Sequence, residues 1–162
     1  MRLLLLGLTG AGKTTIAKIL AEKHDLKLIE ADDEVIRLNG GDWPNDENII
    51  DKYFEVTNAK VLDLDNILYV ISWLTSKRIK EFYDKGFIIF EMHASFDELM
   101  KRKIARDGMS DEEKNRFKDN YKGYVEDVLS KKTLKMFSLS LDTTKISSNQ
   151  ILQKICNKIR QK

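Results

Sequence analysis

Cysteine, histidine and proline are nearly missing from this sequence, and each shortage excludes something. Cys156 is the only cysteine among 162 residues, so no disulfide can form within the chain. It lies on an apolar helical stripe, which predicts a core thiol in a cytoplasmic protein. The two histidines, His24 and His93, have no cysteine or histidine at metal-ligand spacing, which gives no indication of a zinc site. The single proline, Pro44, marks a helix start near Asn45.

An excess of charge of one sign is also missing, as are long apolar runs. The 28 basic and 26 acidic residues nearly cancel, which gives no support for a nucleic-acid or membrane-surface partner. No apolar stretch approaches transmembrane length, and Leu3–Leu6 is too short for the core of a signal peptide. We therefore expect one cytoplasmic domain over residues 1–162, with a composition of 42% hydrophobic and 33% charged residues that suits a soluble protein.

The most informative feature that is present is Gly7-Leu8-Thr9-Gly10-Ala11-Gly12-Lys13-Thr14, a full match to the phosphate-loop pattern. An apolar run of strand length precedes it and a helical stripe follows it. Backbone N–H groups of such a loop turn around a phosphate at the positive end of a helix. Lys13 is expected to reach the β- and γ-phosphates, and the Thr14 hydroxyl to ligate Mg²⁺. The sequence thus predicts ATP and Mg²⁺ as cofactors, held by Gly7, Thr9, Gly10, Ala11, Gly12, Lys13, Thr14 and Thr15.

Strands and helices alternate along the chain. The expected strands are residues 2–6, 27–30, 67–71, 87–90 and 137–141. The expected helices are residues 12–24, 33–38, 74–85 and 96–107, with others starting near Asn45, after the capping box at Ser110 and near Ser148. This alternation predicts an α/β three-layer sandwich with a five-stranded parallel sheet. Ligands of such sheets bind beyond the carboxyl ends of the strands, where Thr9, Asp32 and Ser72 would converge.

Several classes of protein use a phosphate loop. The guanine-reading Asn-Lys-x-Asp string and the Asp-x-x-Gly switch of GTPases do not occur in this chain. A motor ATPase would have a strand ending in a metal-organising acid, for which Phe87–Glu91 is an imperfect candidate. The close spacing of strands instead favours a small-molecule kinase. A non-catalytic nucleotide sensor with an intact loop is the alternative from another class.

A kinase needs a carboxylate that orients or deprotonates the acceptor hydroxyl. Asp32, Asp33 and Glu34 follow the second strand and face the loop across the sheet edge. Asp32 is the first candidate and Glu34 the second, although Asp32 or Asp33 would equally suit a helix N-cap.

A kinase also needs positive groups around the transferring phosphoryl group. Arg102 and Arg106 share one helix face, which fits a mobile basic lid over residues 101–125, or alternatively a solvated basic surface. Arg78 follows the third strand and is either a substrate contact or a surface arginine.

The chain resembles the adenylylsulfate (APS) kinases in the order of several short motifs. Asp32–Arg37 looks like the family's Asp-Gly-Asp-x-Val-Arg segment, and Glu47–Ile49 like its Glu-Asn-Ile. Ile71-Ser72 followed by Arg78, Arg106-Asp107 and Leu141-Asp142-Thr143 are similar to its substrate, lid and adenine segments. The resemblance implies an adenylate-kinase-like P-loop kinase that phosphorylates a ribose 3′-hydroxyl. It also implies substrate contacts from Asp32, Arg37, Asn48, Ser72 and Arg78, and an ATP contact from Thr143.

The departures from that family concern the acceptor. APS kinases carry arginines around Glu-Asn-Ile, whereas this chain has Asn45-Asp46 and Ile50-Asp51-Lys52 there. The resemblance therefore implies a nucleotide less charged than APS, such as the cytidine diphosphoramidate used in bacterial capsule biosynthesis. Lys52, Lys77 or Lys114 could instead replace the missing arginines. A nucleoside monophosphate, gluconate or shikimate type of kinase is the competing expectation, and a homodimer is left open.

Overall fold

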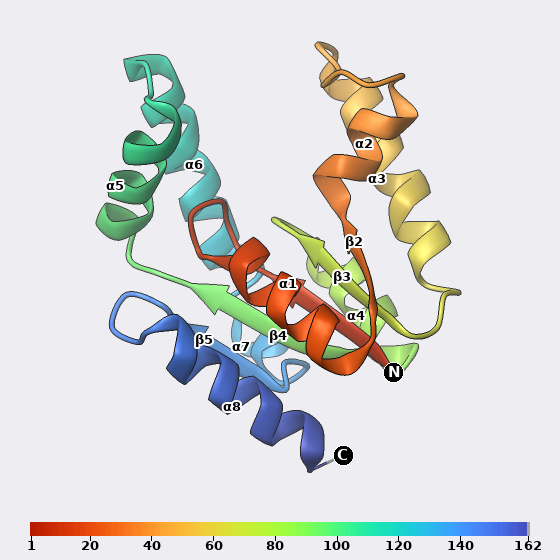
Figure 1. The fold of residues 1–162 in the computed structure, drawn as a ribbon. Coiled ribbons are helices and arrows are strands. Elements are labelled where there is room, and N and C mark those ends of the chain that lie inside the picture. Colours follow the sequence, from red (N-terminus) through yellow and green to blue (C-terminus); the bar gives the residue numbers. More distant parts are fainter. Residues whose placement is uncertain (162) are drawn as a thin grey trace.

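The computed structural model of this chain describes residues 1–161 and places a parallel sheet between layers of helices (Figure 1). The strands are β1 (Arg2–Leu6), β2 (Lys27–Glu30), β3 (Ile67–Ile71), β4 (Ile88–His93) and β5 (Leu139–Asp142). They lie in the order β2-β3-β1-β4-β5, and every neighbouring pair is parallel. The predicted α/β fold with a five-stranded parallel sheet is confirmed.

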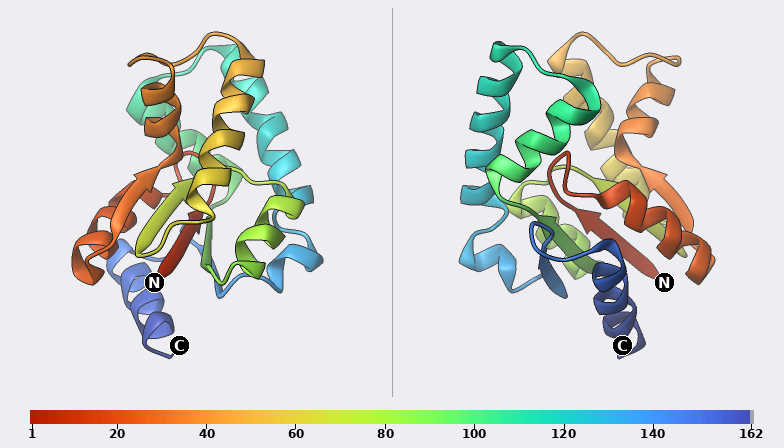
Figure 2. Two further views of the ribbon diagram at one scale, coloured as in Figure 1. Left: turned by 90° about the vertical axis from the view of Figure 1, so that its right-hand side faces the viewer. Right: turned by 60° about the vertical axis from the view of Figure 1, so that its left-hand side comes forward.

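Helices cover both faces of the sheet. They are α1 (Lys13–His24), α2 (Ala31–Leu38), α3 (Glu47–Val61), α4 (Ser76–Asp84), α5 (Phe96–Asp107), α6 (Asp111–Asp127), α7 (Lys131–Leu134) and α8 (Ser148–Arg160). Figures 1 and 2 show α1 and α8 on one face and α4 and α7 on the other. None of the helices within residues 1–161 is long and apolar enough to cross a membrane.

The core follows from the apolar strands. Leu3–Leu6 is completely buried, as expected for a central parallel strand that is covered on both faces. The predicted capping box at the start of α6 is present, because the Ser110 side chain accepts from the N–H of Glu113 and the Glu113 side chain accepts from the N–H of Ser110.

Some element boundaries differ from the sequence prediction. β4 continues to His93 although polar residues begin at Glu91, because the Glu91 side chain finds partners inside the protein. α2 starts at Ala31, directly after β2, and α3 starts after Asp46, whose side chain accepts from Asn48 N–H. The short helix α7 has no counterpart in the prediction.

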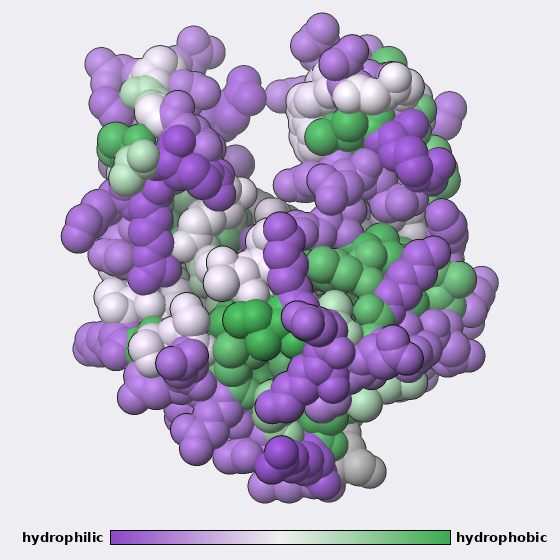
Figure 3. Space-filling model, viewed as in Figure 1, coloured by the Kyte–Doolittle hydropathy of each residue, from purple (hydrophilic) through white to green (hydrophobic). Residues whose placement is uncertain are grey.

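Two helical arms rise beyond the carboxyl ends of the strands. One arm is formed by α2 and α3 and the other by α5 and α6 (Figures 1 and 2). Figure 3 shows a hollow between the two arms, whose surfaces are mostly hydrophilic. This hollow is where ligands of parallel α/β sheets bind.

Candidate active site

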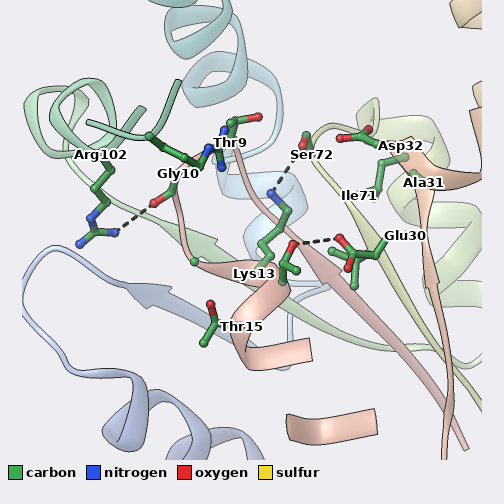
Figure 4. A pocket seen from close by; sticks show the side chains of 14 residues that line it. Thr9, Gly10, Lys13, Thr15, Glu30, Ala31, Asp32, Ile71, Ser72 and Arg102 are labelled. Carbon is green, nitrogen blue, oxygen red and sulfur yellow. Dashed lines mark hydrogen bonds between the residues drawn. The ribbon is translucent and has the colours of Figure 1, made fainter. Parts of the chain in front are cut away.

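The loop between β1 and α1 is built for close approach to the neighbouring strand. A Cβ atom at Gly7 would lie 2.1 Å from the carbonyl oxygen of Met92, so no larger residue fits there. The loop leads into α1, whose first residue is Lys13. The Lys13 ammonium donates to the Leu8 carbonyl at 3.2 Å and lies 3.5 Å from Ser72 Oγ (Figure 4). Lys13 therefore bridges the loop and the end of β3.

Electrostatics at this position are unusual. Lys13 is only 9% exposed, and burial lowers its pKa to about 8, while the negative charges of Asp32 and Glu30 oppose the change. Partial burial raises the pKa of Asp32, the positive Lys13 opposes that rise, and Glu30 and Asp33 add to it. In Figure 4 the Asp32 carboxylate points toward the opening beside Ser72. An ammonium and a carboxylate thus face one cavity.

Glu30 is a site residue that the sequence prediction missed. The Thr14 hydroxyl donates to Glu30 Oε2 at 2.8 Å, and both residues line the same cavity (Figure 4). Glu30 is the last residue of β2 and Asp32 lies in the first turn of α2, so the junction of β2 and α2 supplies two acids. An acid that ends a predicted strand opposite a phosphate loop is the signal that could have identified it.

The cavity between the loop and the two arms measures about 310 Å³. It is lined by ten of the residues predicted from the sequence, Thr9, Gly10, Gly12, Lys13, Thr14, Thr15, Asp32, Ser72, Arg102 and Arg106. Its other lining residues are Glu30, Ala31, Val70 and Ile71. The predicted convergence of the first, second and third strand ends is therefore confirmed, and we name this space the transfer cavity.

A smaller cavity of about 220 Å³ lies on the other side of the loop. Arg102 connects the two, because its guanidinium donates to the Gly10 carbonyl at 3.2 Å and to the Thr143 carbonyl at 2.9 Å. Thr143, predicted near the adenine, is among the residues that line this cavity. Its apolar lining consists of Ala11, Ile16, Met92, Ile146 and Ile151.

A third cavity of about 670 Å³ extends from the transfer cavity toward α3, α4 and α6. Ile71 and Ser72 line both cavities, so the two spaces meet at the end of β3. The remaining lining residues are Asp51, Phe54, Glu55, Asn58, Trp73, Leu74, Thr75, Arg78 and Asn120. Arg78, expected to be either a substrate contact or a surface arginine, lines this cavity, and its guanidinium is ion-paired with both Glu55 and Glu81. We name this space the acceptor cavity.

Four predicted site residues, Gly7, Glu34, Arg37 and Asn48, do not line these three cavities. Glu34 accepts from Arg37 at 2.8 Å and from Lys60 at 3.4 Å, and the bond with Arg37 lowers the pKa of Glu34. Asn48 donates to the Asp46 carboxylate at the start of α3. The structure therefore does not bring Glu34, Arg37 or Asn48 to the Lys13 ammonium, because the helical turn of α2 directs Glu34 toward α3 instead.

Glu91, considered above as a metal-organising acid, is completely buried in β4. It accepts from the Tyr124 hydroxyl at 3.0 Å and the Ser140 hydroxyl at 2.5 Å, and its bond with His93 raises the pKa of that histidine. It does not line the transfer cavity. Glu91 therefore links β4 to α6 and to β5. Trp73 packs edge-on against Tyr124, with ring centroids 5.9 Å apart.

Comparisons with known proteins show the family of this chain. Residues 3–127 match the family model described as the AAA domain, and the chain belongs to that family. A shikimate kinase of Caldicellulosiruptor bescii is 33% identical over 115 residues. That match covers 62% of this chain and 62% of the relative, less than two thirds of the relative's length.

Solved structures of kinases share the fold over nearly the whole chain. A shikimate kinase from Acinetobacter baumannii in complex with shikimate has a TM-score of 0.77 at 16% identity, with 99% of this chain and 93% of that chain covered. A gluconokinase from Sinorhizobium meliloti 1021 has a TM-score of 0.71 at 14% identity, with 99% and 91% covered. The fold is that of the P-loop kinases, and these relatives are phosphotransferases, the class predicted from the sequence. The narrower resemblance to the APS kinases receives no support from them.

Proposed function

We propose that this protein is an ATP-dependent small-molecule kinase that transfers a γ-phosphoryl group to an acceptor hydroxyl. The observation that carries the proposal is that three cavities adjoin one another around the phosphate loop, in the order smaller cavity, transfer cavity and acceptor cavity. Gly10, Gly12 and Arg102 line both the smaller cavity and the transfer cavity, and Ile71 and Ser72 line both the transfer cavity and the acceptor cavity. A nucleoside, a polyphosphate and an acceptor could occupy them in that order, with Lys13 and Asp32 at the point of transfer.

The donors around the transfer cavity fit a magnesium–nucleotide complex. The Thr14 hydroxyl and the Glu30 and Asp32 carboxylates offer oxygen ligands, which Mg²⁺ prefers. Thr14 would bind the ion directly, and Glu30, bonded to Thr14, would orient that hydroxyl or hold a metal-bound water. Mg²⁺ supplies charge neutralisation to the β- and γ-phosphates when it is bound.

The binding of the phosphates and the acceptor would be carried out by the protein's own side chains and loop backbone. The buried Lys13 ammonium would hold the β- and γ-phosphates, and the loop N–H groups would hold the polyphosphate. Asp32 would position the acceptor hydroxyl and accept its proton. This role fits the direction of its carboxylate, which points toward the opening beside Ser72 (Figure 4). Arg106, which lines the transfer cavity from α5, would neutralise charge on the transferring group. Arg102, bonded to Gly10 and Thr143, would fix the loop against the nucleoside side.

The relatives change the expected acceptor. A shikimate or gluconate type of kinase is closer to the comparisons than the ribose 3′-hydroxyl kinase suggested by the APS kinase resemblance. One segment of the resemblance, Glu47–Ile49, also has another explanation, because the Asp46 side chain caps α3 by accepting from the Asn48 N–H and Asn48 does not line the acceptor cavity. We therefore propose a small hydroxylated compound as acceptor.

Two matched variants test the proposed chemistry. Asp32→Asn should lower acceptor-dependent ADP release at least 100-fold while leaving the ATP dissociation constant within about threefold, because general-base catalysis contributes about 10²–10⁴-fold. Asp33→Asn, at the next position but outside the transfer cavity, should stay within about threefold of wild type in the same assays. Equal effects of the two substitutions would contradict the role of Asp32. ATP binding without ADP release with any acceptor would favour the nucleotide sensor.

A further inference from the structure

The charge of the acceptor cavity differs from what an acidic substrate requires. Asp51 and Glu55 both line it from α3, and Arg78 is the only cationic residue among the described residues that line it. The Arg78 guanidinium is ion-paired with Glu55 and also with Glu81 of its own helix α4. Two carboxylates therefore already share the one cation. Asp51 forms no ion pair with any residue of 1–161.

The rest of the lining is aromatic and amide. Phe54 and Trp73 contribute rings, and Asn120 contributes an amide from α6. Asn58 is 3% exposed, and its Oδ1 accepts from the Tyr69 hydroxyl at 2.7 Å. No hydrogen bond of its NH₂ group is found within residues 1–161, and this group is not among the fully buried polar atoms, so it is accessible for a bond to a ligand hydroxyl.

From these observations we infer that the acceptor is a hydroxyl compound with a positively charged amine and no acid group. The inference rests on the proposed kinase function and narrows its substrate. Asp51 and Glu55, one turn apart on α3, face the cavity and would attract the ammonium. Phe54 and Trp73 would add cation–π attraction. Asn58 would bond a hydroxyl while another hydroxyl reaches Asp32.

An acidic acceptor fits less well for the same reasons. Its carboxylate would meet the negative charge of Asp51 directly. To gain a guanidinium contact it would also have to displace Glu55 or Glu81 from Arg78. A neutral polyol would lack the ion pair but would meet no repulsion, so it should rank between the amine and the acid.

The test uses compounds that share a skeleton and differ in charge. ADP release from wild-type protein is measured with glucosamine, glucose and gluconate, and with serinol, glycerol and glycerate. We expect at least one amine to have a kcat/KM at least tenfold above that of its matched acid, with the neutral compound between them. The inference is overturned if neither amine exceeds the kcat/KM of its matched acid by tenfold, or if neither amine supports ADP release.

Variants connect the preference to the cavity. Asp51→Lys should lower kcat/KM for the amine at least tenfold, by raising KM. The same variant should raise kcat/KM for the acid at least threefold. Asp63→Asn removes an exposed acid outside the cavity and should leave both within twofold. An unchanged amine-to-acid ratio in Asp51→Lys overturns the inference. If the protein releases ADP only with the acids as acceptors, and Lys13→Ala abolishes that release, the kinase proposal stands and only the inference on the amine fails.

Discussion

The pKa of Lys13 leads to a quantitative prediction for nucleotide binding. Because burial lowers this pKa to about 8, the free protein carries a charged Lys13 at pH 7 and a mostly neutral one at pH 9. Phosphate oxygens require the charged form. Bound polyphosphate should therefore raise the lysine pKa and take up a proton from solvent. ATP affinity should be highest below pH 8 and should fall as the pH rises through that value.

The magnitude follows from the fraction of charged lysine. With the pKa at about 8, that fraction is about 0.9 at pH 7 and about 0.1 at pH 9, which predicts a roughly tenfold weaker apparent affinity. The tenfold change corresponds to about 1.4 kcal/mol of binding free energy. The phosphate groups contribute little in this range, since their second pKa lies near 6.

Isothermal titration calorimetry with MgATP at pH 7, 8 and 9 measures both quantities. Buffers of different ionisation enthalpy should report uptake of about half a proton at pH 8, where Lys13 is half charged. The Lys13→Met variant is the control, because it should bind ATP more weakly and without this pH dependence. A wild-type affinity constant within twofold from pH 7 to 9, or the same slope in Lys13→Met, would refute the reasoning.

Three further predictions concern stability and the site. Lys13→Met should raise the free energy of unfolding at pH 7 by up to about 3 kcal/mol in urea titrations, because a lysine pKa lowered from 10.5 to about 8 makes the charged form costly to bury. Between pH 8 and 10.5 the unfolded wild-type chain keeps the Lys13 proton that the native state has released. The free energy of unfolding of the wild type should therefore rise over this pH range, and a flat profile would contradict this. Glu30→Gln should lower kcat about 10- to 100-fold and weaken the Mg²⁺ response, whereas Glu22→Gln, which lies outside the transfer cavity, should not; an unchanged Mg²⁺ titration argues against a role for Glu30. Gly123→Ala should destabilise the fold by about 1–3 kcal/mol, because its Cβ would lie 2.7 Å from the Trp73 ring, and unchanged tryptophan fluorescence and urea midpoint would contradict that contact.

Much of the fold and the centre of the site could be predicted because their signals are local. The apolar strand Leu3–Leu6, the phosphate loop and the helix after it lie next to each other in sequence. Parallel strand topology then predicts that Asp32 and Ser72 meet Lys13, and the transfer cavity contains all three. Secondary structure and connection rules are enough for this part.

The acceptor side could not be predicted, because it depends on pairings between distant segments. Arg78 of α4 is a substrate contact or a surface residue by sequence, and only the fold shows Glu55 of α3 beside it. Glu34 lies two residues beyond Asp32, yet the turn of α2 carries it to Lys60. By sequence Glu30 is only the end of a strand, because its bond with Thr14 becomes visible only when β2 and α1 are placed together.

Transfer of label from [γ-³²P]ATP to an acceptor tests the central claim most directly. Wild-type protein, MgATP and the amine, neutral and acid acceptors are incubated together, and labelled products are separated from inorganic phosphate. The kinase account predicts label covalently bound to at least one acceptor, with loss of more than tenfold in Lys13→Ala, because the phosphates lose the buried ammonium. Label found only in inorganic phosphate, or labelled acceptor formed equally by Lys13→Ala with an intact fold, would contradict the account.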